Sequence, residues 1–411
     1  MSITILQSPK TYSPVFNPMN FVCSSNNIAG NNYFFYLCKI KDSSGNVISQ
    51  HRFTPRYDND YLLFDVSREL EKYTSYDISG ISVPSYGVRR TSNVFKEYTV
   101  QFIEEIGSVA SVVASGLNTI SSTLYAYNGS FEYTQNVSYL DTDWLIDTGT
   151  KKFLTDLRGG NIRIKEGQSY ELGIMTGAGA GQPVKNIVIK TYDNSGTIIG
   201  TYKIANSYSS GTTTADKFLS VLVGTADLNL TTLGSGSQPV ITSSVSTYTV
   251  YIENNSSTIV SETLTFEIDR TCYQQDEIRL HWLNSLGRID SYNFNFANDV
   301  SYSVERQAFK KDVGAFNGSA YGYKTYEPAT TNYYTKVDKK IKIRTDYINN
   351  IEAEWFKNLV SSPIVWAEVD GVLVNVIMDT SSYNVQTIEK NKLFSVEFDL
   401  TYSNSSFRQR L

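Results

Sequence analysis

Short runs of alternating apolar and polar residues, separated by turn-forming residues, dominate this 411-residue chain. Near the start, the apolar-rich segment 32–40 meets the turn residues 42–46. Asp, Asn, Ser and Gly favour turns because they tolerate positive φ or bond to their own backbone. By the same rule, Asn128-Gly129 predicts that the strand at 123–127 pairs with an antiparallel strand after the turn.

The middle of the chain repeats this pattern with six apolar segments, at 162–164, 170–175, 187–192, 197–204, 248–253 and 263–268. Strands at roughly 8–12-residue spacing, punctuated by turns, are typical of a β-sandwich. The Gly-rich segment 176–183 has the composition of a phosphate-binding loop, but Pro183 leads it into a strand pattern. A phosphate loop must instead open a helix whose N-terminal amides face the anion. We therefore interpret this segment as the flexible tip of a long hairpin spanning 170–190.

The last third of the chain adds one helix to the strands. Between 349 and 360, apolar residues recur at three- and four-residue steps, as expected for one face of a helix. The stripe comprises Ile348, Ile351, Trp355, Phe356 and Leu359. Asp370-Gly371 predicts a tight hairpin, and 393–402 alternates as a closing strand. A single helix laid on a sheet is an α+β arrangement.

These patterns predict a mainly β protein with two or three β-sandwich-like domains. We place an N-terminal β-sandwich domain at 1–150 and a middle β-sandwich domain, with Gly/Ser/Thr-rich loops, at 151–270. The C-terminal domain, 271–411, is expected to be α+β with aromatic hairpins and a single helix near 349–360. A chain of this length fits two to four domains.

Tyrosine is more frequent than glycine in this sequence, with 30 residues against 26. A tyrosine side chain joins a large apolar ring to a polar hydroxyl, so it suits half-buried sheet faces and protein interfaces. Strands also favour tyrosine, and this preference accounts for part of the excess.

The charge pattern does not indicate a nucleic-acid or membrane surface. The chain has 36 basic and 41 acidic residues, and neither a basic tail nor a basic stripe is present. The basic residues of 339–344 alternate with isoleucines and are expected to form one solvated strand face. The N-terminal residues lack the pattern of a signal peptide, and no segment is apolar enough to cross a bilayer. We expect a soluble protein, made in the cytoplasm, that contacts no membrane and binds no specific nucleic acid.

Candidate catalytic and metal-binding residues are few. His51 and His281 are the only histidines. Few imidazoles are therefore available as the base of a Ser-His-Asp or Cys-His site, or as the ligands of a metal site. Cys23, Cys38 and Cys272 do not have the spacing of a zinc site or a disulfide scaffold. We expect Cys23 and Cys38 to be buried thiols, with a bridge between neighbouring strands as the alternative.

The carboxylates give two weak candidates for chemistry. Glu104 and Glu105 are adjacent in a predicted strand and should therefore face opposite sides of the sheet. Asp141 and Asp143 offer two oxygens, whereas a calcium loop needs six to eight ligands. We predict no enzymatic activity, no cofactor and no metal.

Non-catalytic binding to other proteins is the function that remains, and two segments contain the candidate interface residues. Tyr and Gly are enriched in adaptable interfaces, and both occur in the segment 320–334. The interface candidates are Tyr321, Tyr323, Tyr326, Tyr333, Tyr334, Gly177, Gly179 and Gly181. The alternative is that the tyrosines form a sheet face covering a local core.

Two stretches of the chain resemble segments of known proteins. The opening contains SPKTYSPVFNP at 8–18, NYFFY at 32–36 and FDVS at 64–67, and a later stretch reads RLHWLNSLGRIDSYNF at 279–294. Both resemble structural proteins of phages of Bacteroidetes, including crAss-like phages. The second also has a local explanation, because Asn284 and Gly287 favour a tight turn between two strands. Alternation then places Tyr292, Phe294 and Phe296 on one face.

The resemblance implies a tail or connector component that forms a ring or hub. Such a subunit is expected to pack against copies of itself, as a ring-like homo-oligomer, and against other virion proteins. Its location would be the virion tail, after synthesis in the host cytoplasm, and the resemblance supplies no catalytic residue. Two alternatives stay open: a receptor-binding module that contacts glycans, and a polysaccharide-degrading tail enzyme.

Overall fold

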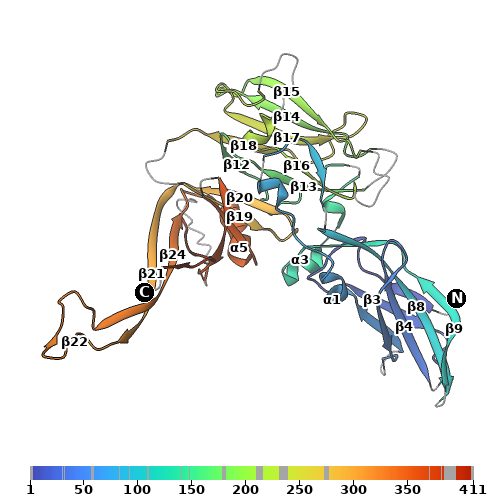
Figure 1. Ribbon diagram of the computed structural model, residues 1–411. Coiled ribbons are helices and arrows are strands. Elements are labelled where there is room, and N and C mark those ends of the chain that lie inside the picture. Colours follow the sequence, from blue (N-terminus) through green and yellow to red (C-terminus); the bar gives the residue numbers. More distant parts are fainter. Residues whose placement is uncertain are drawn as a thin grey trace. The chain divides into compact units, whose positions relative to one another are not determined.

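The computed structural model confirms the mainly β fold and divides the chain into two compact units (Figure 1). Unit 1 comprises Met1–Arg270 and Leu283–Asp290, and unit 2 comprises Thr271–Trp282 and Ser291–Leu411. The residues described are 3–29, 31, 33–56, 60–82, 84–91, 93–108, 111–139, 141–147, 149–177, 182–209, 216–230, 239–272, 277–369, 371–380, 382–383 and 395–408.

Two sheets form the first part of unit 1. One has the order β1-β3-β6 and the other β2-β10-β8-β4-β5, with β9 paired to β8. Their bounds are β1 Ile3–Gln7, β2 Tyr12–Pro14, β3 Asn20–Ser25, β4 Phe34–Lys41, β5 Val47–Phe53, β6 Tyr61–Asp65, β8 Phe95–Ser108, β9 Ser111–Ile120 and β10 Leu124–Tyr127. The predicted hairpin of β4 and β5 is confirmed, with Gly45 at φ +83° in its turn.

A shared core holds these two sheets together. Phe21, Tyr36 and Phe102 are fully buried in it, and aliphatic side chains such as Ile40 and Val100 fill the remaining space. Burying such side chains contributes about 1.5–3 kcal/mol each. Cys23 and Cys38 lie in this core as free thiols, and burial raises the pKa of Cys23 to about 12.

The predicted antiparallel pair around Asn128-Gly129 is wrong. Strand β10 ends at Tyr127, and the chain continues through a loop into helix α3 (Tyr133–Ser138). Gly129 has no positive φ; instead its amide and carbonyl bond to Tyr127 and Phe16. A side chain at 129 would collide with the Tyr127 ring, which would lie 2.4 Å from its Cβ. The glycine is therefore needed for close packing rather than for a hairpin.

The rest of unit 1 contains two further sheets, with the orders β11-β13-β16-β7 and β12-β18-β17-β14-β15. Their bounds are β7 Val88–Arg90, β11 Leu145–Ile146, β12 Asn161–Lys165, β13 Glu171–Thr176, β14 Asn186–Tyr192, β15 Ile198–Ala205, β16 Phe218–Leu222, β17 Thr247–Glu253 and β18 Leu264–Asp269. Because β7 and β11 pair with strands of the middle range, strand pairing crosses the predicted boundary at 150. Short helices α1 (Ser67–Glu71), α2 (Ser79–Ser82), α4 (Thr225–Leu228) and η1 (Asp141–Asp143) connect these strands.

The interpretation of 170–190 as one hairpin is also wrong. Strand β13 pairs with β11 and β16, whereas β14 pairs with β15 and β17 in a different sheet. The segment between them is thus a crossover between two sheets. Hydrophobic alternation predicted both strands but carries no information on which strand pairs with which.

Unit 2 is built on an eight-stranded antiparallel sheet with the order β20-β19-β25-β26-β27-β24-β21, in which β28 pairs with β24. The bounds are β19 Ile278–Leu283, β20 Ile289–Phe294, β21 Phe296–Lys310, β24 Thr330–Arg344, β25 Val365–Val369, β26 Val372–Met378, β27 Glu397–Tyr402 and β28 Ser406–Phe407. The predicted hairpins at Gly287 and Gly371 are confirmed, and both glycines have positive φ. The predicted face of Tyr292 and Phe294 is buried, but Phe296 is 52% exposed because it begins β21.

The predicted helix is confirmed as α5 (Asn350–Ser361), and it packs on this sheet. Phe356 lies against Tyr292, Phe294 and Phe398, with ring centroids 4.8–5.9 Å apart. Asn349 begins the helix with a capping box, accepting hydrogen bonds from two backbone amides of the first turn. Ile351, which the pattern placed in the buried stripe, is 42% exposed at the flank of the helix.

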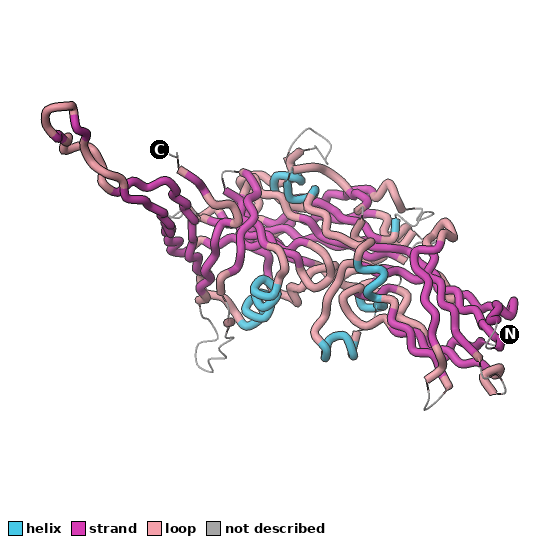
Figure 2. Tube along the Cα trace, turned by 60° about the horizontal axis from the view of Figure 1, so that its bottom comes forward, coloured by secondary structure: helices cyan, strands magenta, loops and turns pink. Residues whose placement is uncertain are grey.

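One hairpin of unit 2 extends beyond the sheet. Strand β27 pairs with β24 only at Lys340–Arg344, and β28 only at Lys336 and Val337. Among the described residues, 330–334 of β24 pair with β21 alone. We call 296–344 the arm; it ends in a small sheet of β22 (Ala315–Phe316) and β23 (Tyr321–Gly322), as Figures 1 and 2 show. In the described part of the chain, no helix has the length and apolar composition needed to span a membrane.

Candidate interaction surface and buried polar clusters

The structure places all five candidate tyrosines on the arm. Tyr321 lies in β23 and Tyr323 and Tyr326 follow it, whereas Tyr333 and Tyr334 lie in β24. The exposed fractions are 61%, 71% and 76% for the three tip residues and 46% for Tyr333. The alternative of a sheet face covering a local core therefore does not describe the tip. Contact of these rings with a partner stays a prediction.

Local contacts hold the rings of the arm in place without burying them. The Tyr321 hydroxyl donates to the Val313 carbonyl, and the Tyr333 hydroxyl donates to Gln307 Oε1 at 2.8 Å. Gly314 has a φ of +91°, and a Cβ at this position would lie 3.0 Å from the Tyr321 ring. The glycine therefore leaves room for the ring. Hydrogen bonds from their hydroxyls therefore fix the Tyr321 and Tyr333 rings in exposed positions.

The register of β21 and β24 gives the arm two different faces. Residues opposite one another in an antiparallel pair point to the same face. Val300 faces Ile341, Tyr302 faces Lys339 and Val304 faces Val337. The alternate pairs are polar: Ser301 with Lys340, Ser303 with Asp338, and Glu305 with Lys336. The arm is therefore amphipathic over 300–305 and 336–341.

The apolar face of the arm continues the core face of the sheet. Ile341 pairs with both Val300 and Leu400, and Ile343 pairs with Phe398, against which α5 packs. Ile341 is 2% exposed, but further along the arm Val300 and Tyr302 are 50% and 64% exposed. Helix α5 covers this face on the sheet, and no element among the residues that the structure describes covers it at Val300 and Tyr302 to the same extent.

The glycine candidates lie in unit 1. Gly177 follows β13, and a Cβ at this position would approach the Asp147 side chain to 3.2 Å. Gly179 and Gly181 lie outside the described residues. No role for these three in an interface follows from the structure.

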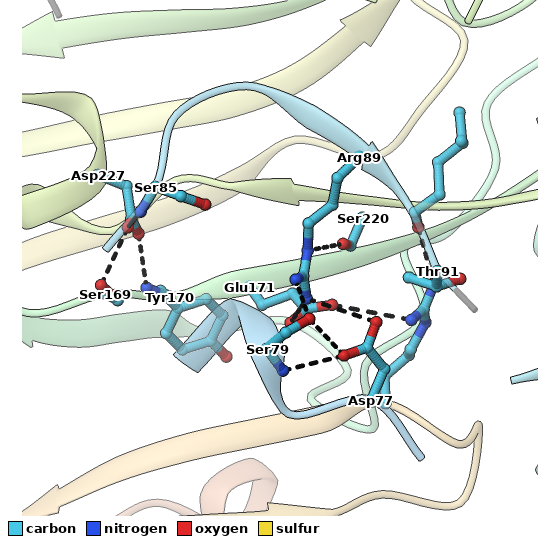
Figure 3. Close-up of polar contacts among 12 residues, drawn as sticks. Asp77, Ser79, Ser85, Arg89, Thr91, Ser169, Tyr170, Glu171, Ser220 and Asp227 are labelled. Atoms are coloured by element: carbon cyan, nitrogen blue, oxygen red, sulfur yellow. Dashed lines mark hydrogen bonds and ion pairs between the residues drawn. The ribbon is translucent and has the colours of Figure 1, made fainter. Parts of the chain in front are cut away.

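A buried ionic cluster in unit 1 centres on Glu171 (Figure 3). Arg89 Nη2 donates to Glu171 Oε2 at 2.8 Å, and its Nε donates to Ser220 Oγ at 2.8 Å. Asp77 lies 3.9 Å from the same guanidinium. The Glu171 carboxylate is almost fully buried, so the Arg89 guanidinium stabilises a charge that water cannot reach.

Arg288 is the second cation of this cluster. It projects from the turn of the β19–β20 hairpin and lies 3.7 Å from Glu171. Its Nη2 donates to the Leu219 carbonyl at 2.9 Å and to Thr91 Oγ1 at 3.2 Å. Burial lowers the pKa of its guanidinium, and Glu171 opposes this effect. Gly173 makes room for the side chain, since a Cβ there would lie 2.6 Å from Arg288.

Asn284 shapes the turn that carries Arg288. Its Oδ1 accepts hydrogen bonds from the amides of Leu286 and Arg288, at 3.0 and 2.9 Å. Its Nδ2 donates to Asp290 Oδ1 and to the Leu154 carbonyl. Ser285 donates from its amide to Asp156 at 2.7 Å. The polar residues of this turn thus bond to one another and to other segments of unit 1.

Asp227 is a further buried carboxylate in Figure 3. It accepts hydrogen bonds from Ser169 Oγ and from the amides of Tyr170, Gly224 and Ser85, at 2.9–3.2 Å. Burial raises its pKa to about 6, although these hydrogen bonds favour the charged form. Each bond goes to a neighbouring loop or strand, so the carboxylate joins several segments.

Unit 2 brings together a serine, a histidine and a glutamate that sequence reasoning did not connect. His281 Nδ1 lies 2.7 Å from Ser291 Oγ, and its Nε2 lies 3.4 Å from Glu368 Oε2. Cross-strand register explains the group, because β25 pairs His281 with Trp366, two residues from Glu368. Ser291 and His281 are 3% and 1% exposed, so a substrate cannot reach the hydroxyl. The arrangement is a packed polar cluster.

Three of the four carboxylates singled out in the sequence bond to residues distant in the chain. Glu104 accepts hydrogen bonds from Ser25 Oγ and Asn27 Nδ2, whereas Glu105 pairs with Arg52 at 2.6 Å. Asp141 accepts from the Tyr12 amide at 3.3 Å. Within the described ranges, no three His, Cys, Asp or Glu side chains gather as a metal site.

Sequence reasoning missed the clusters around Glu171, Asp227 and His281. Their members come from separate strands, and only the turn signal of Asn284 and Gly287 pointed to one of them. Pairing between distant strands decides which buried polar groups meet, and a single sequence does not encode that pairing locally.

Comparison with known proteins adds little to the geometry. No family model and no curated protein matches the chain. Among solved structures, the chicken CNTN1 FN1–FN3 domains match at 10% identity, over 83% of this chain and 91% of that one, with a TM-score of 0.18. Trypsin-activated alpha-2-macroglobulin from Escherichia coli matches at 8% identity, over 99% and 34% of the two chains, with a TM-score of 0.20. Similarity this low assigns no function.

Proposed function

We propose that this protein is a non-enzymatic structural subunit that acts by packing against other protein chains. The observation that carries the proposal is the arm, where ten consecutive residues, 301–310, are all exposed together with the tip tyrosines. A two-stranded hairpin is at best marginally stable in water, and exposed apolar patches of this kind mark interaction sites. An arm with this composition is explained by a partner that covers it.

We place this subunit in a phage tail or connector, where it would form a ring or hub with copies of itself and contact other virion proteins. The setting is supported by the resemblance of 8–18, 32–36, 64–67 and 279–294 to structural proteins of phages of Bacteroidetes. The buried bonds of Asn284 and Arg288 are consistent with that stretch having a structural role.

The first experiment measures the assembly state of the purified chain. We expect native mass spectrometry and electron microscopy to show multimers of defined stoichiometry, alone or with particle proteins. A chain that stays monomeric at high concentration and joins no particle would refute the proposal. The phage setting is tested separately, by locating the chain in a cryo-EM map of an intact virion.

A glycan-binding module is the second candidate, because exposed tyrosine rings at the tip also suit sugar stacking. A glycan array with the purified protein separates the two functions. Saturable binding that Tyr323→Ala and Tyr326→Ala abolish would favour the receptor-binding function, whereas a structural subunit gives no signal. Release of reducing sugars from capsule, lost on a single Asp or Glu substitution, would instead indicate an enzyme.

A further inference from the structure

We infer that the arm pairs with the arm of a second copy of this chain, β21 against β21 across a two-fold axis; this inference rests on the proposed function and names the partner of the arm. Strand β21 lies at the edge of its sheet. One side of β21 pairs with β24, and in the described part of the chain no strand pairs with the other side. Over 300–304 that side therefore offers backbone amides and carbonyls to another strand.

The segment 300–304 lacks the features that normally protect an edge strand. Proteins block exposed edges with charged side chains, prolines or bulges. The segment reads VSYSV, without a charge or a proline, and all of its residues are exposed. The register shifts of the β21–β24 ladder lie on either side of it, between Phe296 and Asp299 and between Gln307 and Ala308. Because valine and tyrosine favour strands, the segment suits pairing with a further strand.

The sequence of this segment selects a second copy as the occupant, because VSYSV is a palindrome. Antiparallel pairing reverses one strand, so a second copy of the segment presents the same residues in the same order. Centred on Tyr302, the pairing places like residues opposite one another: Val300 with Val304, Ser301 with Ser303, and Tyr302 with Tyr302. Aromatic and hydroxyl pairs of this kind stabilise antiparallel strands. The contact closes with two copies, so a ring or hub uses a further surface of the chain.

The two paired arms form a four-stranded sheet with one continuous apolar face. Opposite residues of an antiparallel pair share a face, so the apolar residues of both copies lie on the same side. Strand β24 extends each row, with Ile341 opposite Val300, Lys339 opposite Tyr302 and Val337 opposite Val304. A two-stranded ribbon is at best marginally stable in water, and three or more strands with a hydrophobic face are needed for stability. Pairing therefore stabilises the arm and covers its exposed edge.

Charge opposes this contact only weakly. Residues 296–335 contain four basic and four acidic residues, so two arms carry no net charge against each other. The register brings Asp299 opposite Glu305 of the other copy. Both side chains are exposed, and interactions between exposed charges are weak and screened by salt.

Opposite charges at position 302 test the two-fold contact. Tyr302 is 64% exposed, so Tyr302→Lys and Tyr302→Glu should fold with the circular dichroism of the wild type. Each variant alone places two like charges opposite one another, and we expect self-association to weaken at least about tenfold in sedimentation over a concentration range. A mixture of the two variants places lysine opposite glutamate, so association should return. Tyr323→Lys and Tyr323→Glu, at the tip, are the matched controls and should associate like the wild type.

Cysteine cross-linking tests the register. In a Cys272→Ser background, which removes the exposed thiol, Ser301→Cys copies are mixed with ¹⁵N-labelled Ser303→Cys copies and oxidised with glutathione disulfide. A disulfide needs a Cα separation of about 4.4–6.8 Å, which only directly opposite residues of the two strands satisfy. We expect disulfides that join position 301 of one copy to position 303 of the other, in large excess over links between two 301 or two 303 positions.

The outcomes separate the inference from the proposed function. A multimer that survives Tyr302→Lys and Tyr302→Glu unchanged, or that the mixture does not restore, overturns the inference and leaves the structural function standing. Predominant links from 301 to 301 or from 303 to 303 show a different register and overturn it as well. So does a chain that joins a particle but stays monomeric in solution. A strictly monomeric wild-type chain that joins no particle refutes both.

Discussion

Glycines at tight turns in this protein differ in the space available for a side chain at the same position. Gly287 and Gly196 both have positive φ, +74° and +80°. A Cβ at Gly196 has nothing within 4 Å, whereas a Cβ at Gly287 would lie 1.8 Å from the Asn128 carbonyl oxygen. The turn at Gly287 therefore combines a backbone requirement with close packing in unit 1.

We predict that Gly287→Ala destabilises unit 1 clearly more than Gly196→Ala. The conformational cost alone is about 1–2 kcal/mol for a non-glycine residue at positive φ, and it should describe Gly196→Ala. Gly287→Ala adds displacement of a backbone carbonyl, so we expect a further loss of about 1–3 kcal/mol by analogy with overpacking. Urea unfolding of both variants measures the difference; equal losses would show that the Asn128 contact does not matter.

His281 makes the stability of unit 2 depend on pH. Burial lowers the pKa of its imidazole from 6.5 to about 4, despite the hydrogen bond with Glu368. The unfolded chain therefore takes up a proton first as the pH falls. The stability that neutral His281 contributes is complete above pH 6.5 and is lost as the pH falls towards 4, by on the order of 3 kcal/mol.

Substitution of His281 tests this effect. His281→Gln cannot take up a proton, so we expect its unfolding free energy to fall less steeply between pH 6.5 and 4 than that of the wild type. Urea unfolding followed by tryptophan fluorescence suits the measurement, because Trp282, Trp355 and Trp366 all lie in unit 2. The same slope in both proteins would show that the imidazole has the same pKa in the folded and unfolded states.

At the scale of single elements, α5 shows how a helix is fixed by its cap and its packing. Asn349 and Glu352 satisfy the first backbone amides, and Trp355, Phe356 and Leu359 fill the core of unit 2. The apolar pattern was sufficient to predict this helix. The pattern did not predict that Ile351 is 42% exposed.

We predict a graded loss of stability across α5. Phe356→Ala should cost about 3–5 kcal/mol, because the ring is fully buried among other aromatic residues. Asn349→Ala should cost about 1 kcal/mol through loss of the cap. Glu354→Ala, on the exposed face, is the control and should stay within about 0.5 kcal/mol. Thermal unfolding would contradict this order if the control were as damaging as Phe356→Ala.

At the scale of the whole molecule, the arm is distinguished by its apolar face rather than by its charge. Residues 296–335 contain four basic and four acidic residues, and the positive excess of 336–344 lies where β24 also pairs with β27 and β28. Lys342 and Arg344 form ion pairs there with Glu397. The apolar face is therefore expected to contribute more to association than the charges of the arm.

We predict that self-association holds or strengthens as salt increases, because the apolar face of the arm is expected to carry it. The Debye length falls from about 10 Å at 0.1 M to about 3 Å at 1 M, which would weaken an association held by charge. Sedimentation at both salt concentrations distinguishes these cases, and clear weakening at 1 M would contradict the prediction.

The sequence by itself determined the mainly β class, helix α5, and the hairpins at Gly45, Gly287 and Gly371. These features depend on local terms: side-chain alternation, capping and turn preferences act within a few residues. The exposed tyrosine-rich segment was also recognised from composition. By the same local reasoning, however, Asn128-Gly129 and 170–190 were wrongly assigned as hairpins.

Only the tertiary structure decided which distant strands pair and which polar groups meet. The clusters of Glu171 with Arg288, and of His281 with Glu368, join residues far apart in the chain. The two faces of the arm likewise follow from the register of β21 on β24. A shift of one residue would reverse every side chain on a strand, and that register is fixed by the packing of the whole unit, which no local pattern contains.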